Sequence, residues 1–436
     1  MTGITHRSLV DRRPLRVHGP LWVVLAVALA IRAAIVVATP GYAPFGDPAD
    51  YDRIARFLQH FGTYPPSTFA DPTGAAALRP PGYPYLLAGV YDVLGVHWQV
   101  ARLVGGVLGT VAVALLWGIV RRVWDARLAL WSAGIAAVLP SLVWVGGGLT
   151  AESLFVPLLL GAVWAAVRHR DAPHARWVAA AGVLLGLAVL TRTNGAIAVL
   201  PLLAAAWLPR RRWSDPVVLL VGLALALAPW TVRNAAVFGS FSPLGTQSGF
   251  TLAGAYNPES AQPGPYRAAW RVPMDVPSLQ VVFHRPGTDE AAVDADLRDR
   301  ALRFAWDHPG FVVSATVIHA RQLLHLTTAT ERASGGSFRE MGMPRWTWGP
   351  SVAAFLVLLA AAIAGAVLLV RRGRDRGPLW LWLVPVVLFL GVVPLLGPPR
   401  YRIPVDPFLA ILAAVALLAV RDRVAARRAA RRAARG

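Results

Sequence analysis

The sequence predicts an all-α polytopic membrane protein with about ten transmembrane helices, short surface helices and a mixed outer loop. The chain has 436 residues, of which 56% are hydrophobic, and its mean hydropathy is +0.51. Soluble domains are closer to about 45–50% apolar. The apolar residues fall in runs of roughly 20, the length that crosses a bilayer core of about 30 Å. The 17 tryptophans suit the aromatic belts at the two membrane interfaces.

The composition also excludes several kinds of chemistry. The chain has no cysteine, so disulfides, thiolate metal sites and thiol nucleophiles are ruled out. All 43 basic residues are arginine, and the formal net charge is +20. Basic cytoplasmic loops of a membrane protein explain this charge, so we expect no nucleic-acid partner. The first apolar run ends at Thr39-Pro40 without a small-residue cleavage site, which predicts a retained helix.

Ten apolar segments are predicted to span the membrane. They cover residues 21–39, 100–120, 128–145, 153–167, 177–190, 195–208, 217–231, 350–370, 379–396 and 403–420. Arg32 lies two-thirds of the way along the first segment. A charge at that depth is costly, so we expect its side chain to face protein or water.

The arginines predict the orientation of these spans. When the N-terminus is placed in the cytoplasm, the arginine clusters fall on the cytoplasmic side, as the positive-inside rule requires. They are Arg7, Arg12, Arg13 and Arg16; Arg121, Arg122 and Arg127; Arg168, Arg170 and Arg176; Arg210 to Arg212; Arg371, Arg372, Arg374 and Arg376; and seven between Arg421 and Arg435. Both termini are then cytoplasmic, and the polar segments 41–98 and 233–346 lie on the outer face.

Four regions follow from this topology. Residues 1–232 form an N-terminal transmembrane module whose first outer loop, 40–98, holds a candidate catalytic site. Residues 233–348 form an extracytoplasmic loop region, 349–420 the C-terminal transmembrane helices, and 421–436 a basic tail. The tail is expected to be an amphipathic helix attracted to anionic lipid.

The two outer segments have internal patterns of their own. Apolar spacing predicts surface helices at 47–61 and 85–94, with Asp47 at a helix N-terminus, where a carboxylate is favourable. Residues 240–266 are expected to be irregular and 289–306 helical. Residues 311–326 form a helix that is either interfacial or spanning, with His319 and His325 expected at the interface.

The stretch from Gly46 to Pro84 is the strongest candidate for a site. It contains Asp47, Asp50, Asp52 and Asp71, and the run Arg79-Pro80-Pro81-Gly82-Tyr83-Pro84. Aromatic and proline residues surround these charges. A segment between membrane spans with this composition is more typical of a functional site than of a simple connection.

A second set of polar residues falls at helix ends on the same side of the membrane. It comprises Thr150, Glu152, Arg192, Asn194, Arg233, Asn234, Arg400, Tyr401 and Arg402. Taken singly, arginines at helix ends often only extend toward the interface. As a set, they predict an anion site, because arginine forks match phosphate oxygens. A lipid with a phosphate head group is the expected ligand.

Several stretches together resemble the GT-C glycosyltransferases, in particular the bacterial group that is similar to glycosyltransferase family 39. They are GDPADYDRIARFL, RPPGYPYLLAGVYDVLG, LTAESLFVPLLL, GLAVLTRTNGAIAVLPLL, PWTVRNAAVFGSFSPL and PRYRIPVDPFLAIL. They follow the family's order and cover most of the membrane part. The group includes protein O-mannosyltransferases and the lipid A aminoarabinose transferase. The resemblance implies a GT-C-like bundle.

The resemblance also implies roles for individual residues. Asp47 matches the acidic residue taken as the catalytic base, Tyr51 the tyrosine that follows it, and Arg79 the basic residue that contacts the donor phosphate. Asp50 stands where the aminoarabinose transferase has an arginine, so it is a competing base, and another arginine must replace that phosphate contact. The remaining expected substrate-binding residues are Tyr83, Glu152, Arg192, Arg233, Asn234, Arg400, Tyr401 and Arg402.

The implied activity is the transfer of a hexose or pentose from a polyprenyl phosphate to an acceptor hydroxyl on the outer face of the cell membrane, with inversion. The acceptor is a glycan, a glycolipid or a protein. Arginines suffice to stabilise a lipid-phosphate leaving group, so we expect no metal and no other cofactor. Two alternatives remain open: a transporter or flippase of a phosphate-bearing lipid, which predicts charges near the membrane midplane, and a non-catalytic scaffold.

Overall fold

The computed structural model describes residues 18–70, 74, 76–283, 287–327, 336–371 and 373–434. Seven residues named above lie outside the described ranges: Arg7, Arg12, Arg13, Arg16, Asp71, Arg372 and Arg435. The described residues form helices joined by turns, and no β-strand occurs among them. The predicted all-α class is therefore confirmed.

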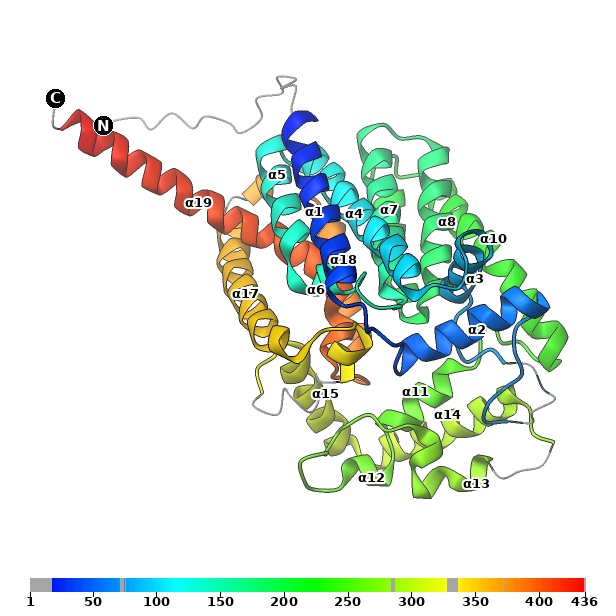
Figure 1. The fold of residues 1–436 in the computed structure, drawn as a ribbon. Coiled ribbons are helices and arrows are strands. Elements are labelled where there is room, and N and C mark those ends of the chain that lie inside the picture. Colours follow the sequence, from blue (N-terminus) through cyan, green and yellow to red (C-terminus); the bar gives the residue numbers. More distant parts are fainter. Residues whose placement is uncertain are drawn as a thin grey trace.

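A helix bundle forms the larger part of the molecule (Figure 1). Each of the ten segments that were predicted to span has a helix in this bundle. The helices are α1 (His18–Ala38), α4 (Trp98–Val123), α5 (Ala126–Val138) with α6 (Pro140–Trp144), α7 (Glu152–Asp171), α8 (Ala175–Thr191), η1 (Thr193–Ala198) with α9 (Val199–Trp207), α10 (Ser214–Phe238), α17 (Trp348–Arg371), α18 (Leu379–Val392), and η6 (Pro399–Val405) with α19 (Asp406–Ala433). Five of the described helices are long and apolar enough to span by themselves: α1, α4, α10, α17 and α19.

Small residues let neighbouring helices approach closely in this bundle. A Cβ atom at Gly182 of α8 would collide with the main-chain oxygen of Leu219 in α10. At the contact of α17 with α19, a Cβ atom at Gly365 would collide with the main chain of Leu412. Close backbone approach at small residues is typical of membrane helices, where packing replaces the hydrophobic driving force.

The first two bundle helices, α1 and α4, each contain a buried arginine. Arg32 of α1 is 2% exposed and donates to the main-chain oxygens of Ala28, Ala137 and Leu142 at 2.9 to 3.1 Å. Arg32 therefore faces protein, as its depth in the first span predicts. Arg102 of α4, which no sequence pattern singled out, donates to the Gly147 main-chain oxygen at 2.5 Å.

The predicted surface helices lie at one end of the bundle. They are α2 (Asp47–Phe61) and α3 (Gly82–Leu94). Their shared core includes the buried rings of Tyr51 and Tyr83, which are 5.3 Å apart. α2 ends at Phe61 and is capped by Gly62, whose φ of 69° is the left-handed conformation that glycine adopts readily.

The second long polar segment folds against the same end of the bundle (Figure 1). Its helices are α11 (Gln247–Ala255), α12 (Pro258–Ala261), η2 (Pro273–Asp275), η3 (Pro277–Leu279), α13 (Gln280–Phe283), α14 (Glu290–Asp307), α15 (Pro309–Leu323) and η4 (Arg345–Thr347), and residues 336–340 are also helical. The expectation that residues 240–266 are irregular was wrong for 247–255 and 258–261, where α11 and α12 form, and α11 packs its apolar face on α14. His319 and His325 are buried rather than interfacial. His319 is held by the main-chain oxygens of Ala268 and Val393.

Glu290 ties this segment to the first polar loop. Its carboxylate accepts hydrogen bonds from the Ser67 hydroxyl and the Ala77 N–H, both at 2.6 Å, and from the Thr246 hydroxyl. Burial raises the pKa of Glu290, and these donors oppose the rise. The two polar segments therefore form one cap at this end of the bundle.

The basic tail continues the last bundle helix without a break. α19 runs from Asp406 to Ala433, and its exposed final turns carry the arginines that were expected in a separate amphipathic helix. The start of α1 and the end of α19 lie at the end of the bundle away from α2, α11 and α14 (Figure 1).

Candidate active site

Asp47 stands at the first turn of α2, where the chain turns out of the first span. The preceding Gly46 has a φ of 65°, and Pro48 fixes the backbone at the second helical position. The carboxylate of Asp47 lies between two arginines. Its Oδ1 is 2.7 Å from Nη2 of Arg79, and its Oδ2 accepts a hydrogen bond from Nη2 of Arg400. Arg79 and Arg400, which lie 32 and 353 positions further along the chain than Asp47, thus contact the same carboxylate.

Arg79 is shared between two carboxylates. It donates to Oδ2 of Asp50 from Nε at 3.1 Å and from Nη2 at 2.7 Å. The Tyr64 hydroxyl donates to the Arg79 main-chain oxygen at 2.6 Å, and the Arg79 guanidinium lies 5.8 Å from the centre of the Tyr51 ring. Asp50 is 40% exposed and Asp47 17%. Of the two competing bases, Asp47 is therefore the more enclosed and the more strongly paired.

Arg400, at the start of η6, is the centre of the charged cluster. Its side chain is 2% exposed. Besides Asp47, it lies 3.1 Å from Oε1 of Glu152 and 2.7 Å from Oε2 of Glu340. Its Nε and Nη1 nitrogens are close enough for ion pairing but are not aligned as hydrogen-bond donors. These two nitrogens retain unused donor capacity.

Arg192 and Tyr401 complete this side of the cluster. Arg192, at the end of α8, donates to Oε1 of Glu152 at 2.5 Å. The Tyr401 ring centre lies 4.8 Å from the Arg192 guanidinium and 5.1 Å from that of Arg400. Such positions over the ring face are attractive for a cation. The other carboxylate oxygen of Glu152 has no hydrogen-bond partner.

The ion-paired residues form one cluster of unequal charge, which we call the charged cluster. Its seven members are the carboxylates of Asp47, Asp50, Glu152 and Glu340 and the guanidiniums of Arg79, Arg192 and Arg400. With every member ionised, the charged cluster has one negative charge in excess.

The arginines and the burial act in opposite directions on the two central carboxylates. Burial by itself would raise the pKa of Asp47, but Arg79 and Arg400 outweigh it and hold that pKa well below its usual range. Glu340 behaves differently. Burial raises the pKa of Glu340 to about 7, and the charge of Arg400 only partly opposes this rise.

The structure does not bring all the expected residues into the charged cluster. Arg233 donates to the Ala76 main-chain oxygen at 2.9 Å and lies over the Tyr64 and Trp230 rings, and Asn234 donates to the Ser242 main-chain oxygen at 2.9 Å. Both hold loop backbone in place. Arg402 pairs with Asp406 at 2.9 Å.

Tyr83 packs its ring in the core of α2 and α3, beside Tyr51. It therefore supports the cluster through Tyr51 and does not pair with its charged groups.

Glu340 was missed by the sequence analysis. It lies in the polar segment before α17, in a stretch with no recognisable motif. Its only sequence signal is an acid in the run Arg339-Glu340-Met341-Gly342, close to the start of an apolar span. The contact with Arg400 depends on how the whole segment folds.

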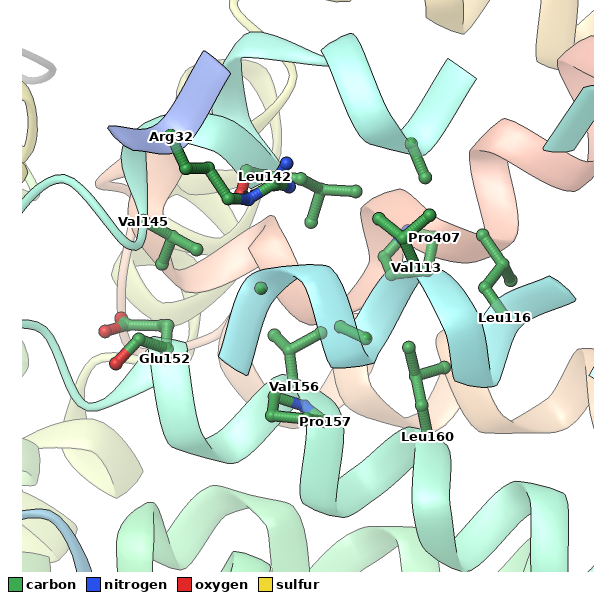
Figure 2. Close-up of a pocket in the computed structure, with 14 residues that line it drawn as sticks. Arg32, Val113, Leu116, Leu142, Val145, Glu152, Val156, Pro157, Leu160 and Pro407 are labelled. Carbon is green, nitrogen blue, oxygen red and sulfur yellow. Dashed lines mark hydrogen bonds between the residues drawn. The ribbon is translucent and has the colours of Figure 1, made fainter. Parts of the chain in front are cut away.

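A small cavity lies inside the bundle next to the charged cluster (Figure 2). Glu152, Ser153 and Arg32 are among the residues that line it, and the wall is apolar, with Val113, Leu160 and Pro407 among its other members. Glu152 therefore belongs both to the charged cluster and to the wall of the cavity. Among the described residues, no three His, Asp or Glu side chains are placed to hold a metal ion.

Comparisons with known proteins give a family match over part of the chain and a similar fold. Residues 78–232 match the family of dolichyl-phosphate-mannose-protein mannosyltransferases, and this match includes Arg79, Glu152 and Arg192. The fold is similar to that of the archaeal oligosaccharyltransferase AglB from Archaeoglobus fulgidus in complex with an inhibitory peptide and a dolichol-phosphate, with a TM-score of 0.55 and 18% identity over 95% of this chain. The chain has the GT-C fold. The resemblance predicted from the sequence is confirmed.

Two further structures are similar. The apo form of the A. fulgidus oligosaccharyltransferase gives a TM-score of 0.53 with 17% identity over 95% of this chain. ArnT from Cupriavidus metallidurans bound to undecaprenyl phosphate gives a TM-score of 0.39 with 18% identity, over 91% of this chain and 77% of ArnT. The chain spans about half the length of the oligosaccharyltransferase, 52% in both structures. No curated protein sequence matches the chain.

Proposed function

We propose that the protein is a membrane glycosyltransferase that moves a sugar from a polyprenyl-phosphate donor to an acceptor hydroxyl. The observation that carries this proposal is the position of Asp47, a carboxylate held between Arg79 and Arg400 at the mouth of a GT-C bundle. A displacement with an anionic leaving group requires a base for the attacking hydroxyl and cations that stabilise the leaving group. Asp47, Arg79 and Arg400 supply these groups within ion-pairing distance of one another. The match to a family named for dolichyl-phosphate-mannose donors supports the class of donor.

The reaction is a single displacement at the anomeric carbon. Asp47 accepts the proton of the acceptor hydroxyl, and the acceptor oxygen forms a bond to the anomeric carbon as the bond from that carbon to the phosphate oxygen breaks. The polyprenyl phosphate leaves with the electron pair of the broken bond, and Arg79 and Arg400 stabilise its added charge. Attack on the face opposite the leaving group inverts the anomeric configuration.

The pairing of Asp47 has a consequence for its strength as a base. A carboxylate whose pKa is held low by two arginines is a weak proton acceptor. When a donor phosphate takes over part of the bonding capacity of Arg79 and Arg400, the stabilisation of the Asp47 charge falls and its pKa rises. Donor binding therefore makes Asp47 a stronger base. Proton transfer to Asp47 is then limited to sites in which the donor is bound.

The proposed orientation places the charged cluster on the outer face of the cell membrane and both termini in the cytoplasm. The supporting observation is that the arginine-rich end of α19 and the cap with the charged cluster lie at opposite ends of the bundle (Figure 1). In this arrangement, residues 40–98 supply the base and residues 233–348 take part in acceptor binding. Residues 349–420 supply Arg400.

Transport of a phosphate-bearing lipid is less well supported. A transporter places its binding charges near the membrane midplane, at broken helices. Here the charged cluster lies at one end of the bundle, and both Nη nitrogens of the buried Arg32 donate to main-chain oxygens.

A transfer assay tests the proposed function. The purified protein in nanodiscs is offered a panel of polyprenyl-phosphate hexoses and pentoses with a mixture of glycan, glycolipid and peptide acceptors, and the release of free polyprenyl phosphate is followed. We expect release from one donor by the wild type and none by Asp47→Asn. The matched control Asp92→Asn, at an exposed position of α3, should release it as the wild type does. The proposal would be contradicted if the wild type transported lipid phosphate and released no polyprenyl phosphate, or released it equally from every donor.

A further inference from the structure

Residues 336–344, which we call the strap, lie across the charged cluster. The strap brings Glu340 against the start of α2, where the Asp47 N–H points at Oε1 of Glu340 at 3.5 Å. A Cβ atom at Gly46 would stand only 2.5 Å from that oxygen, so a larger residue there would displace the Glu340 carboxylate. On its other side, the strap backbone rests on Gly148, where a Cβ atom would collide with the Glu340 main-chain oxygen. The strap is therefore fitted closely to the site.

Glu340 is an anion already in contact with Arg400. Its Oε2 lies 2.7 Å from Nη1 of Arg400, one of the two nitrogens that are not aligned as hydrogen-bond donors. An incoming phosphate oxygen that is aligned with Nη1 would replace a poorly directed contact with a better one.

The charge of the cluster makes the binding of a further anion costly. The four carboxylates already exceed the three guanidiniums by one negative charge, and a phosphodiester donor adds another. An uncompensated charge in a partly buried site is expensive and is usually removed by protonation. One carboxylate is therefore expected to become neutral when the donor binds.

The contacts single out one of the four carboxylates. Asp47 has two arginines, Glu152 has Arg192 and Arg400, and the exposed Asp50 has a two-nitrogen contact with Arg79. Glu340 has one misaligned arginine contact and one long backbone contact. It is the carboxylate that loses least on protonation.

We propose that Glu340 occupies the place of the donor phosphate on Arg400 in the empty site, and that it takes up one proton when the phosphate arrives. The neutral carboxyl group then donates a hydrogen bond instead of repelling the phosphate. This inference rests on the proposed function, because the anion that it assigns to the site is the phosphodiester of the donor.

The groups that face Glu340 fit this role. Arg400 is its only cationic neighbour in the charged cluster, whereas Asp47 and Glu152 both disfavour its charge, and burial disfavours it more strongly still. The result is a pKa of about 7 for Glu340 in the empty site. A second negative charge at Arg400 would raise this pKa further, so donor binding and proton uptake favour each other.

The test is the pH dependence of ligand binding. The probe is farnesyl methyl phosphate, a diester whose single charge does not titrate between about pH 5 and 9. Its Kd is measured in detergent for the wild type, Glu340→Gln and Glu259→Gln, a matched control in the same polar segment that accepts hydrogen bonds from Ser278 instead. We expect the wild type and the control to lose about tenfold in affinity for each pH unit above the pKa of Glu340.

Glu340→Gln is expected to bind the diester with a nearly constant Kd across this range, close to the value that the wild type reaches at low pH. A pH dependence that is the same in Glu340→Gln and the wild type would overturn the inference and leave the proposed function standing, because another group would then take up the proton. A wild type that binds the diester at no pH would refute the proposed donor class, and the inference with it.

Calorimetry provides a second reading that needs no variant. The heat of diester binding to the wild type is measured at about pH 8 in buffers of different ionisation enthalpy. We expect uptake of close to one proton per diester bound, and uptake near zero would overturn the inference even if Glu340→Gln failed to fold.

Discussion

Replacing Glu340 by glutamine should stabilise the empty protein at high pH, although it removes an ion pair. Burial of Glu340 raises its pKa from the usual 4.5 to about 7. A raised carboxyl pKa means that the folded state favours the protonated form. The contribution of this group to stability is therefore fully present below the unfolded pKa and is lost as the pH rises through about 7.

The magnitude follows from the size of the shift. At about 1.4 kcal/mol per pKa unit, the rise from 4.5 to about 7 corresponds to about 3 kcal/mol of stability lost well above pH 7. Glutamine is neutral at every pH and has nearly the same shape, so it avoids this loss. Arg400 keeps Asp47 and Glu152 as partners in the variant.

Thermal unfolding in detergent at a series of pH values measures the effect. We expect the Tm of Glu340→Gln to be close to that of the wild type at about pH 5 and a few degrees higher at about pH 9. Glu259→Gln should show no such divergence with pH. A Glu340→Gln variant that is less stable than the wild type at high pH would refute the reasoning, because the ion pair with Arg400 would then outweigh the cost of burying the charge.

Three further predictions concern the other charged residues. Arg79→Gln should raise the KM for the donor by roughly 10- to 100-fold, since a charged hydrogen-bonding contact is worth about 1.5–3 kcal/mol, and an unchanged KM would count against phosphate binding by Arg79. Asp50→Asn should reduce turnover far less than Asp47→Asn, because Asp50 is more exposed and contacts only Arg79; equal losses in kcat would make Asp50 an equal candidate for the base. Arg402→Met should lower the Tm, because it leaves Asp406 buried without its cation, at a cost of about 3–5 kcal/mol. Arg402→Met should leave the KM for the donor unchanged. A rise in KM without a change in Tm would indicate that Arg402 binds the donor.

The sequence predicted the bundle and much of the site because these depend on local patterns. Apolar runs and the distribution of arginines predict the spans and place the polar helix ends on one side. The prediction of α2 at 47–61 matches the structure residue for residue, since Asp47-Pro48 and Gly62 are strong start and stop signals. Short connections restrict the positions that residues on one side of a bundle can take, so Asp47, Arg79 and Arg400 come into contact.

The remaining features depend on details that local patterns do not contain. Arg400 and Arg402 are two residues apart in a 3₁₀ helix, where each residue turns the chain by about 120°, so the two side chains point in different directions. Only Arg400 enters the charged cluster. Glu340 reaches Arg400 through the fold of a long polar segment whose own core, on α11 and α14, has no sequence motif. The contact of Glu340 with Arg400 can be recognised only from the structure, in which the strap packs against Gly46 and Gly148.

The most direct test of the central claim is a paired measurement on Asp47→Asn. Binding of the donor and release of polyprenyl phosphate are followed in the same nanodisc preparation, with the donor that the wild type accepts. If Asp47 is the base, the variant binds the donor at least as well as the wild type, because two arginines have lost a competing carboxylate, and it releases no polyprenyl phosphate. A variant that turns over at the wild-type rate would contradict the assignment of Asp47 and, with it, the proposed mechanism.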